Sequence, residues 1–189
     1  MDSGRHAKEE QPGLFRSVLS FILMVAIVFV AAWLLRSFVI APYKIPSGSM
    51  ENTIMISDKL FAEKVSYYFR GPNPGEIVTF EDPEVEGRTL IKRCIAVAGQ
   101  TVDLIDGAVY VDGQRLDEPY TNGQPSNPLS TAHGVSLEYP YTIPEGHIWV
   151  MGDNRQNSAD SRYFGAISVE KVTGHAVMIY WPVNRVGTF

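Results

Sequence analysis

The sequence predicts a mainly β protein, in which an N-terminal transmembrane helix precedes an all-β domain of short antiparallel strands. The first observation is a single long apolar run, since no charged residue occurs from Val18 through Leu35. The second is a series of short runs rich in β-branched residues that follows it and is separated by turn residues. Beyond the apolar run we find no amphipathic helical period of useful length. The strands are therefore expected either to close into a barrel or to pack as two sheets.

Composition limits the classes of function. A chain of 189 residues with 45% hydrophobic and 20% charged residues suits one globular domain plus an anchor. The net charge of -5 argues against a general nucleic-acid binder, which would need a basic face. Cys94 is the single cysteine and the four histidines lie far apart, so neither an intrachain disulfide nor a metal-ligand spacing is present. We expect no nucleic-acid partner and no metal.

The apolar run predicts an anchor over residues 14–40, after a polar tail over residues 1–13. Its length reaches the roughly 18 residues that a spanning helix needs at about 1.5 Å per residue. A cleavable signal peptide is the alternative, and Ala31-Ala32 offers small residues for cleavage. The apolar region of such a peptide is usually only about 7–15 residues long, so an uncleaved anchor is favoured.

The orientation of the anchor follows weakly from charge. Arg5, Lys8 and Arg16 precede the run, while Arg36 and Lys44 follow it, so the positive-inside bias is slight. The short tail is the easier segment to leave in the cytoplasm. This places residues 41–189 on the outer side.

The strands of the domain are expected in seven runs. Asp106-Gly107 and Asp112-Gly113 are typical of tight hairpin turns between them. The segment Thr121 to Gly134 is dense in Asn, Gly, Pro and Ser and predicts a surface loop. The expected strands are 77–80, 90–97, 102–105, 109–111, 141–143, 147–151 and 176–181.

The first segment that could carry chemistry is Ile45-Pro46-Ser47-Gly48-Ser49-Met50. Its proline and glycine interrupt any regular ladder, so the turn can hold a serine hydroxyl clear of the backbone. Taken alone, two serines around a glycine more often form a solvated turn. A nucleophilic serine needs a base from elsewhere in the chain.

The second segment is the apolar strand Leu90 to Gly99, which a charge pair interrupts at Lys92 and Arg93. A lysine there usually lies on the solvated face of a half-buried strand. The residues around it do not alternate cleanly, however, so Lys92 could also point inward. Burial would lower its pKa, and a neutral amine beside Ser49 would serve as general base.

The third segment is Met151 to Gly165, where polar residues crowd together directly after an apolar strand. One interpretation is a long turn held by Asx-type hydrogen bonds. The other is an ion-pair network of Arg155, Asp160 and Arg162 that positions neighbouring catalytic groups.

The order of these segments resembles bacterial type I signal peptidases: Ser-Met after Pro-Ser-Gly, then Lys-Arg in an apolar strand, then Gly-Asp-Asn-Arg-x-Asn-Ser-x-Asp-Ser-Arg. The single anchor and the segment Tyr180 to Arg185 resemble the Gram-positive members. The resemblance implies a fold of the signal peptidase/LexA type and a serine/lysine dyad without a cofactor. Ser49 would be the nucleophile and Lys92 the general base, and the Ser49 amide and the Ser47 hydroxyl would form the oxyanion hole.

The resemblance also implies supporting residues. Ser158 would hydrogen-bond the lysine and orient it, and Asp160 would pair with Arg162 and with Arg93. Asp153 belongs to the same supporting group. The residues that would shape shallow substrate pockets are Ile45, Pro46, Met50, Ile54, Leu90 and Ile91.

The chain departs from the common pattern of the family at four positions, and none of them removes a catalytic group. They bear on loop rigidity and substrate preference, and they are Asn52, Ala98, Gln100 and Gln156.

By this resemblance the chain is expected to be a membrane-bound serine endopeptidase that removes signal peptides from secreted preproteins. It would prefer small side chains at the first and third positions before the cleaved bond. It would lie in the plasma membrane as a single-pass protein with a cytoplasmic N-terminus, and would work in the lipid bilayer beside the secretion translocon. A self-cleaving serine/lysine repressor protease is a rival, but the spanning segment and the lack of a DNA-binding helix pair count against it. A non-catalytic relative is another, but both Ser49 and Lys92 are present.

Overall fold

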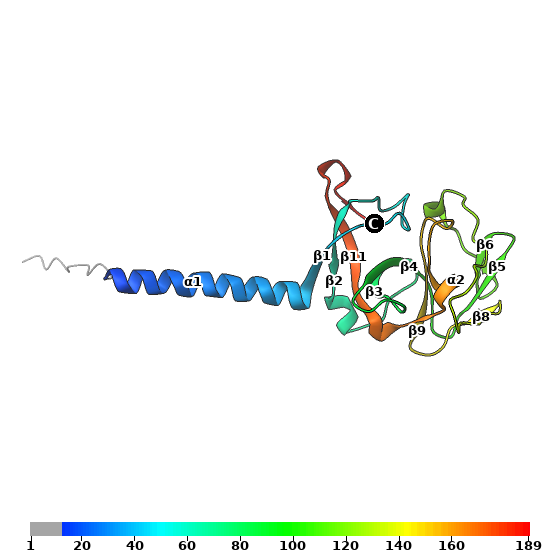
Figure 1. Ribbon diagram of the computed structural model, residues 1–189, viewed down its shortest axis with the longest axis horizontal. Helices are drawn as coiled ribbons and strands as arrows, with labels where there is room; N and C mark the ends of the chain where they lie inside the picture. The colour runs from blue at the N-terminus through cyan, green and yellow to red at the C-terminus, as the bar shows by residue number, and fades with distance from the viewer. Residues whose placement is uncertain (1–12) are drawn as a thin grey trace, which may run out of the picture. The chain divides into compact units, whose positions relative to one another are not determined.

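The computed structural model describes residues 13–189, which form two compact units divided between Ser37 and Phe38 (Figure 1). The first unit is helical in its described part, and the second carries all the described strands. The predicted class, a mainly β protein with an N-terminal apolar helix, is confirmed. Apart from Gly13, the expected tail, with Arg5 and Lys8, lies outside the described residues.

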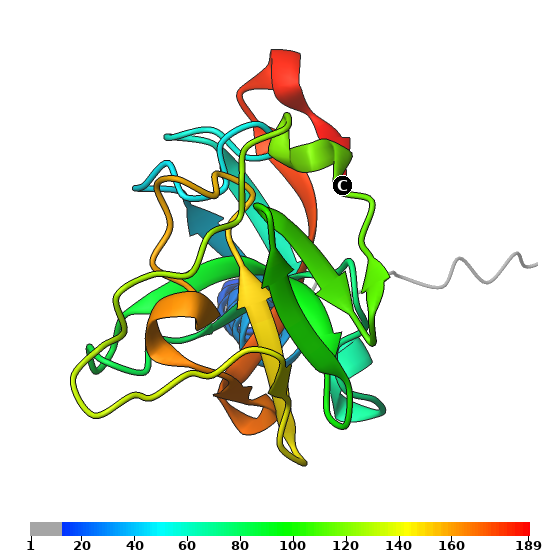
Figure 2. The same cartoon turned by 90° about the vertical axis from the view of Figure 1, so that its right-hand side faces the viewer.

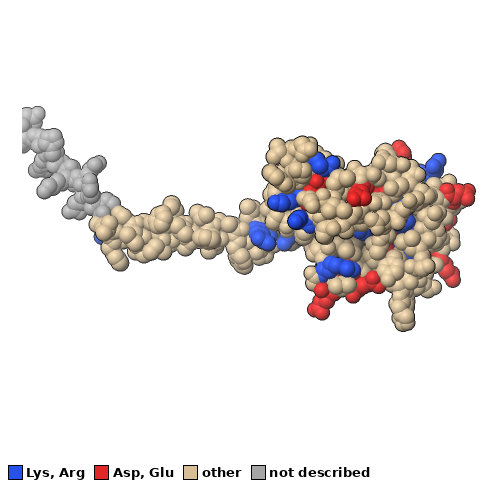
Figure 3. Space-filling view, turned by 45° about the horizontal axis from the view of Figure 1, so that its top comes forward, with Lys and Arg blue, Asp and Glu red and all other residues tan. Residues whose placement is uncertain are grey.

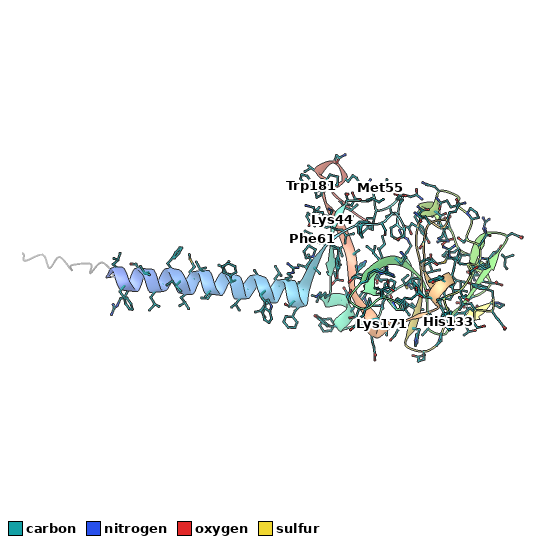
Figure 4. All side chains as sticks on the ribbon, viewed as in Figure 1. Lys44, Met55, Phe61, His133, Lys171 and Trp181 are labelled. Atoms are coloured by element: carbon teal, nitrogen blue, oxygen red, sulfur yellow. The ribbon has the colours of Figure 1, made fainter. Side chains whose placement is uncertain are left out.

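The helix α1 runs from Leu14 to Leu34 and continues into a π-helical turn at Leu35–Val39. The stretch Leu14–Val39 has a mean hydropathy of 2.9 and is long enough to cross a membrane. None of the α1 side chains is buried, and they project all around its axis (Figure 4). Figure 3 shows the helix almost free of charge except near its ends, whereas the surface of the second unit carries both signs.

The larger sheet has eight strands in the order β1-β2-β11-β3-β4-β9-β10, with β12 paired to β11. Every pairing in it is antiparallel. Its strands are β1 (Ile40–Lys44), β2 (Lys59–Glu63), β3 (Ile77–Glu81), β4 (Thr89–Val97), β9 (His147–Met151), β10 (Ile167–Ser168), β11 (Val172–Trp181) and β12 (Gly187–Thr188).

The smaller sheet has four strands in the order β7-β6-β5-β8. Of the two expected arrangements, the chain therefore adopts two sheets. Asp106 and Gly107 both have left-handed φ angles, 51° and 77°, and form the β5–β6 turn, while Asp112 and Gly113 do the same between β6 and β7. These pairs were expected at hairpins because Asp and Gly tolerate this conformation. The strands are β5 (Thr101–Ile105), β6 (Ala108–Val111), β7 (Gln114–Arg115) and β8 (Tyr141–Thr142).

The smaller sheet lies beside β9, as both ribbon views show (Figure 2). An apolar cluster that contains Val102, Val109 and the wholly buried Trp149 joins it to the larger sheet. A separate cluster contains Ile45, Met50 and Ile54 together with Leu60, so the segment after β1 packs against the larger sheet.

Sequence reasoning missed β1 and β2, which pair from Ile40↔Glu63 to Lys44↔Lys59. β1 follows the apolar run without a turn residue to mark its start, and β2 begins and ends with a charged residue. Between the strands lie the short helix α2 (Ser161–Phe164) and 3₁₀ turns at Val65–Tyr68, Pro119–Thr121, Val169–Lys171 and Val183–Arg185.

Candidate active site

The segment Ile45 to Met50, here called the nucleophile turn, leaves β1 and is fixed at its start. The Ile45 N–H donates to the Asp58 carbonyl oxygen (2.9 Å), and the Ser57 N–H donates to the Ile45 carbonyl oxygen (2.8 Å). Met50, fully buried, holds its other end in the core. Ser49 is buried at 7% exposure, whereas Ser47 is exposed. The turn thus places one serine inside a cleft and the other at its surface.

Lys92 points inward, which decides between the two orientations that its sequence allowed. It lies on β4 opposite Val78 of β3 and is only 3% exposed. Its Nζ donates a hydrogen bond to Ser49 Oγ at 2.6 Å. Within residues 13–189, no carboxylate lies within ion-pair distance of this amine.

Burial lowers the pKa of the Lys92 ammonium to about 8. The carboxylates of Asp160, Asp82 and Asp153 act against burial and raise this pKa, while the Arg162 guanidinium lowers it. At pH 7 about one Lys92 in ten would then be neutral, compared with about one in several thousand for a free lysine. The site can therefore supply an amine base at neutral pH.

Arg93, the next residue on β4, is paired instead. Its Nε and Nη2 donate to the two oxygens of Asp153 at 2.9 and 2.6 Å, and Thr53 Oγ1 donates to the same carboxylate. The expected pairing of Arg93 with Asp160 is wrong. Arg93 stands opposite Met151 on β9, so the carboxylate that it meets is the one two residues further along the chain.

Asp160 pairs with Arg162, as the resemblance implied, with Nε and Nη2 at 2.9 Å from its two oxygens. It also accepts from the Gly152 N–H at 3.0 Å. Arg162 Nη2 donates in addition to the Arg155 carbonyl oxygen at 2.8 Å. These bonds close residues 152–162, here called the catalytic loop, into a rigid unit.

Ser158 does not form the hydrogen bond to Lys92 that the resemblance implied. It is 9% exposed, and its buried Oγ has no hydrogen-bond partner in the described part of the chain. This hydroxyl lies against Gly152, where an added Cβ would overlap both Ser158 Oγ and the Ser49 carbonyl oxygen. Only glycine at this position lets the catalytic loop approach Ser49 so closely.

Sequence reasoning missed the residues that neutralise Arg155. This arginine is 1% exposed, pairs with Glu118, and donates to Ser126 Oγ and to the Gly152 carbonyl oxygen. The ring of Tyr120 covers Arg93, 4.0 Å from its guanidinium carbon. A buried arginine signals that a partner exists, but nothing in the sequence identifies a carboxylate far from it in the chain.

A cleft of about 360 Å³ contains Ser47, Ser49 and Lys92. Of the residues expected to shape substrate pockets, Pro46, Leu90 and Ile91 line it. The other three lie beneath the nucleophile turn in the core, at 3% exposure or less: Ile45, Met50 and Ile54. The residues that line the cleft can touch a substrate directly, while the three core residues support the nucleophile turn from below.

Two departures from the family pattern have structural consequences. Asn52 has a φ of 90°, which proline cannot adopt. The backbone conformation of this loop is therefore incompatible with the proline that is more common at this position in the family. Gln100 accepts from the Val97 N–H (3.0 Å) and donates to Asp112 (2.9 Å), which fixes the turn after β4. Neither residue lines the cleft.

The chain was compared with known proteins. The family described as signal peptidase, peptidase S26, matches residues 18–181. A probable signal peptidase I-1 of Synechocystis sp. is 42% identical over 173 residues, which cover 88% of this chain and 83% of that protein. A signal peptidase I of Leptolyngbya laminosa is 34% identical, covering 94% and 86%. The crystal structure of a signal peptidase I from Enterococcus faecalis V583 is 32% identical and covers 56% of this chain and 97% of that chain, with a TM-score of 0.46.

We predict that Lys92→Met stabilises the protein near neutral pH. Because burial lowers the pKa of Lys92 from 10.5 to about 8, the folded state binds fewer protons than the unfolded chain between these pH values. Wild-type stability therefore rises with pH across this window and carries a constant penalty below it, at most roughly 3 kcal/mol. The advantage of Lys92→Met should be largest below pH 8 and shrink towards pH 10.5.

The measurement is the free energy of unfolding of both proteins in denaturant from pH 6 to 10. Lys44→Met is the matched control, since Lys44 is exposed on β1 (labelled in Figure 4). A Lys92→Met protein clearly less stable than wild type at pH 7 would show that the lysine is solvated or paired.

Proposed function

The chain belongs to the signal peptidase family, peptidase S26, and we propose that it is a membrane-anchored endopeptidase that cleaves preproteins with a dyad of Ser49 and Lys92. Membership makes it a serine hydrolase of signal peptide processing. The observation that carries the dyad is the 2.6 Å contact between Lys92 Nζ and Ser49 Oγ inside a cleft. A buried amine with a lowered pKa next to a hydroxyl supplies both a base and a nucleophile.

The proposed reaction begins when neutral Lys92 removes the proton of Ser49 as Oγ attacks the scissile carbonyl carbon. The negative charge that develops on the carbonyl oxygen is stabilised by the Ser49 N–H and the Ser47 hydroxyl. Lys92, now an ammonium, returns the proton to the departing amine of the mature protein. Water then attacks the carbonyl carbon of the acyl-enzyme while Lys92 takes one of its protons. Lys92 returns this proton to Ser49 Oγ as the ester bond breaks, which releases the signal peptide and restores both residues.

The supporting residues keep Lys92 at the correct distance without neutralising it. Asp153 and Asp160 each form an ion pair with an arginine, so their charges raise the pKa of Lys92 less than unpaired carboxylates would. Ser158 Oγ lies against Gly152, which also approaches the Ser49 carbonyl oxygen. We propose that its hydroxyl completes the environment of the amine once substrate enters.

The substrate is proposed to be an extended peptide with small side chains at the first and third positions before the cleaved bond. The apolar residues Pro46, Leu90 and Ile91 line the cleft beside Ser49. Their side chains offer apolar contact area to a peptide backbone and to small side chains.

The stretch Leu14–Val39 is proposed to be the membrane anchor, with the N-terminus in the cytoplasm and the strands outside. A signal peptide has an apolar segment of its own, which would sit in the same bilayer. Confinement of both partners to one membrane raises their effective concentration without a new contact. We propose that the protein acts there beside the secretion translocon.

The first prediction of the dyad is that Ser49→Ala and Lys92→Ala each lower cleavage by at least about 1000-fold, and that the double variant is no worse. Groups that act as one unit are strongly non-additive. The purified full chain is incubated with a preprotein, and the new N-terminus is sequenced. Lys44→Met serves as control. Substantial cleavage by Lys92→Ala, with no other amine supplied, would disprove the mechanism.

A second prediction concerns the rate as a function of pH. Because the pKa of Lys92 is lowered to about 8, kcat should rise along a limb with its midpoint near this value. A solvated lysine would instead give a limb near the free value of about 10.4. Steady-state rates from pH 6 to 11 with a soluble peptide separate the two, and a midpoint near 10 would contradict the assignment.

The anchor is tested by deleting residues 1–36. The remaining unit contains all described strands and its own core, so it should fold and cleave soluble peptides. Its rate on preproteins embedded in vesicles should fall at least about tenfold relative to the full chain, because the shared confinement is lost. Equal rates of the two proteins on embedded preprotein would leave the anchor without a catalytic role.

A further inference from the structure

Asn154, in the catalytic loop, reaches across to the nucleophile turn with three hydrogen bonds. Its Nδ2 donates to the Gly48 carbonyl oxygen at 3.0 Å and to the Glu51 carboxylate at 3.2 Å. Its backbone N–H donates to the Ser49 carbonyl oxygen at 3.1 Å. No step of the dyad reaction described above uses this side chain, although it links the two segments by hydrogen bonds.

The Gly48 carbonyl and the Ser49 N–H belong to the same peptide unit. This unit is planar and trans, so its N–H points opposite to its carbonyl. A donor that holds the Gly48 oxygen therefore also fixes the direction of the Ser49 N–H. The Glu51 N–H donates to the same oxygen at 3.1 Å, so the Gly48 carbonyl accepts two hydrogen bonds, one from Glu51 and one from Asn154. Such bonds polarise the peptide and strengthen its N–H as a donor, by about 10–30% per bond.

Glu51 orients the amide of Asn154. A carboxylate accepts only, so its contact with Nδ2 defines which end of the amide faces the turn. The two hydrogens of Nδ2 are then directed to Gly48 and to Glu51. Gly48 makes room for this arrangement, because an added Cβ would lie 2.7 Å from the Glu51 carboxyl group.

We infer that Asn154, held by Glu51, is the positioning residue of the oxyanion hole. It sets the direction and strength of the Ser49 N–H through the Gly48–Ser49 peptide and does not touch the substrate. This inference rests on the proposed function, in which that N–H stabilises the developing oxyanion. Because the oxyanion exists only after attack, the contribution belongs to kcat and not to substrate binding.

The test is Asn154→Leu in the full chain, assayed with a preprotein and a soluble peptide. This variant removes both side-chain hydrogen bonds without adding charge. Loss of a direct oxyanion donor costs about 100- to 1000-fold, so loss of its positioning should lower kcat roughly 10- to 100-fold. KM should change less than about threefold, and the pH midpoint near 8 should stay, because Lys92 keeps its surroundings. Asn184→Leu, an exposed asparagine of the last 3₁₀ turn, is the control.

A double variant separates positioning from general support of the fold. Asn154→Asp with Glu51→Gln restores a hydrogen bond between these two side chains with the roles reversed, but gives Gly48 no donor from residue 154. The thermal midpoint should recover relative to Asn154→Leu while kcat stays low. If Asn154→Leu does not fold, this double variant answers the question alone.

The outcomes are distinct. A full chain that does not cleave preprotein disproves the proposed function and the inference with it. A full chain that cleaves, together with an Asn154→Leu protein of unchanged kcat or a double variant of restored kcat, overturns the inference alone.

Discussion

The buried amine of Lys92 is the group on which the rest of the active site depends. Two adjacent cations on β4, Lys92 and Arg93, are both buried, yet among residues 13–189 only Arg93 has a carboxylate partner. An unpaired ammonium in such a position is costly, and this cost leaves part of the amine unprotonated at neutral pH, where it can accept a proton. The ion pairs of the catalytic loop surround it without neutralising it. Since buried ion pairs contribute little net stability, we interpret them as a rigid support that keeps carboxylates away from the lysine.

The nucleophile turn packs against the catalytic loop at two glycines, one in each segment. Gly48 leaves space for a carboxylate and Gly152 leaves space for the Ser49 carbonyl and Ser158. At Gly152 the backbone approaches the Ser49 carbonyl oxygen, and at Gly48 the neighbour is the Glu51 side chain, so main-chain and side-chain donors can form hydrogen bonds across the gap. The geometry of the serine is therefore determined from two sides, by the apolar core below it and by the catalytic loop beside it.

Much of this arrangement could be predicted from the sequence. β-branched runs and Asp-Gly turns identified seven strands and the hairpin of the smaller sheet because these signals are local. The approach of Ser49 to Lys92 was expected from the order of the motifs. The pairing of Arg93 with Asp153 could not be read from the sequence, since it depends on the register between β4 and β9. The same holds for Glu118 and Tyr120, whose contacts arise only when the two sheets pack together, and for the unpartnered hydroxyl of Ser158.

Glu118 pairs with Arg155 and Tyr120 covers Arg93, and these contacts limit which substitutions the protein tolerates. The smaller sheet contributes no residue to the cleft around Ser49, and its loops resemble the surface segments that usually accept substitution freely. Yet its connecting segment covers Arg93 and neutralises Arg155, which holds the Gly152 carbonyl beside Ser49. The two sheets are thus coupled through these side-chain contacts. A substitution in the segment 118–126 is therefore expected to disturb the catalytic loop, although this segment does not line the cleft.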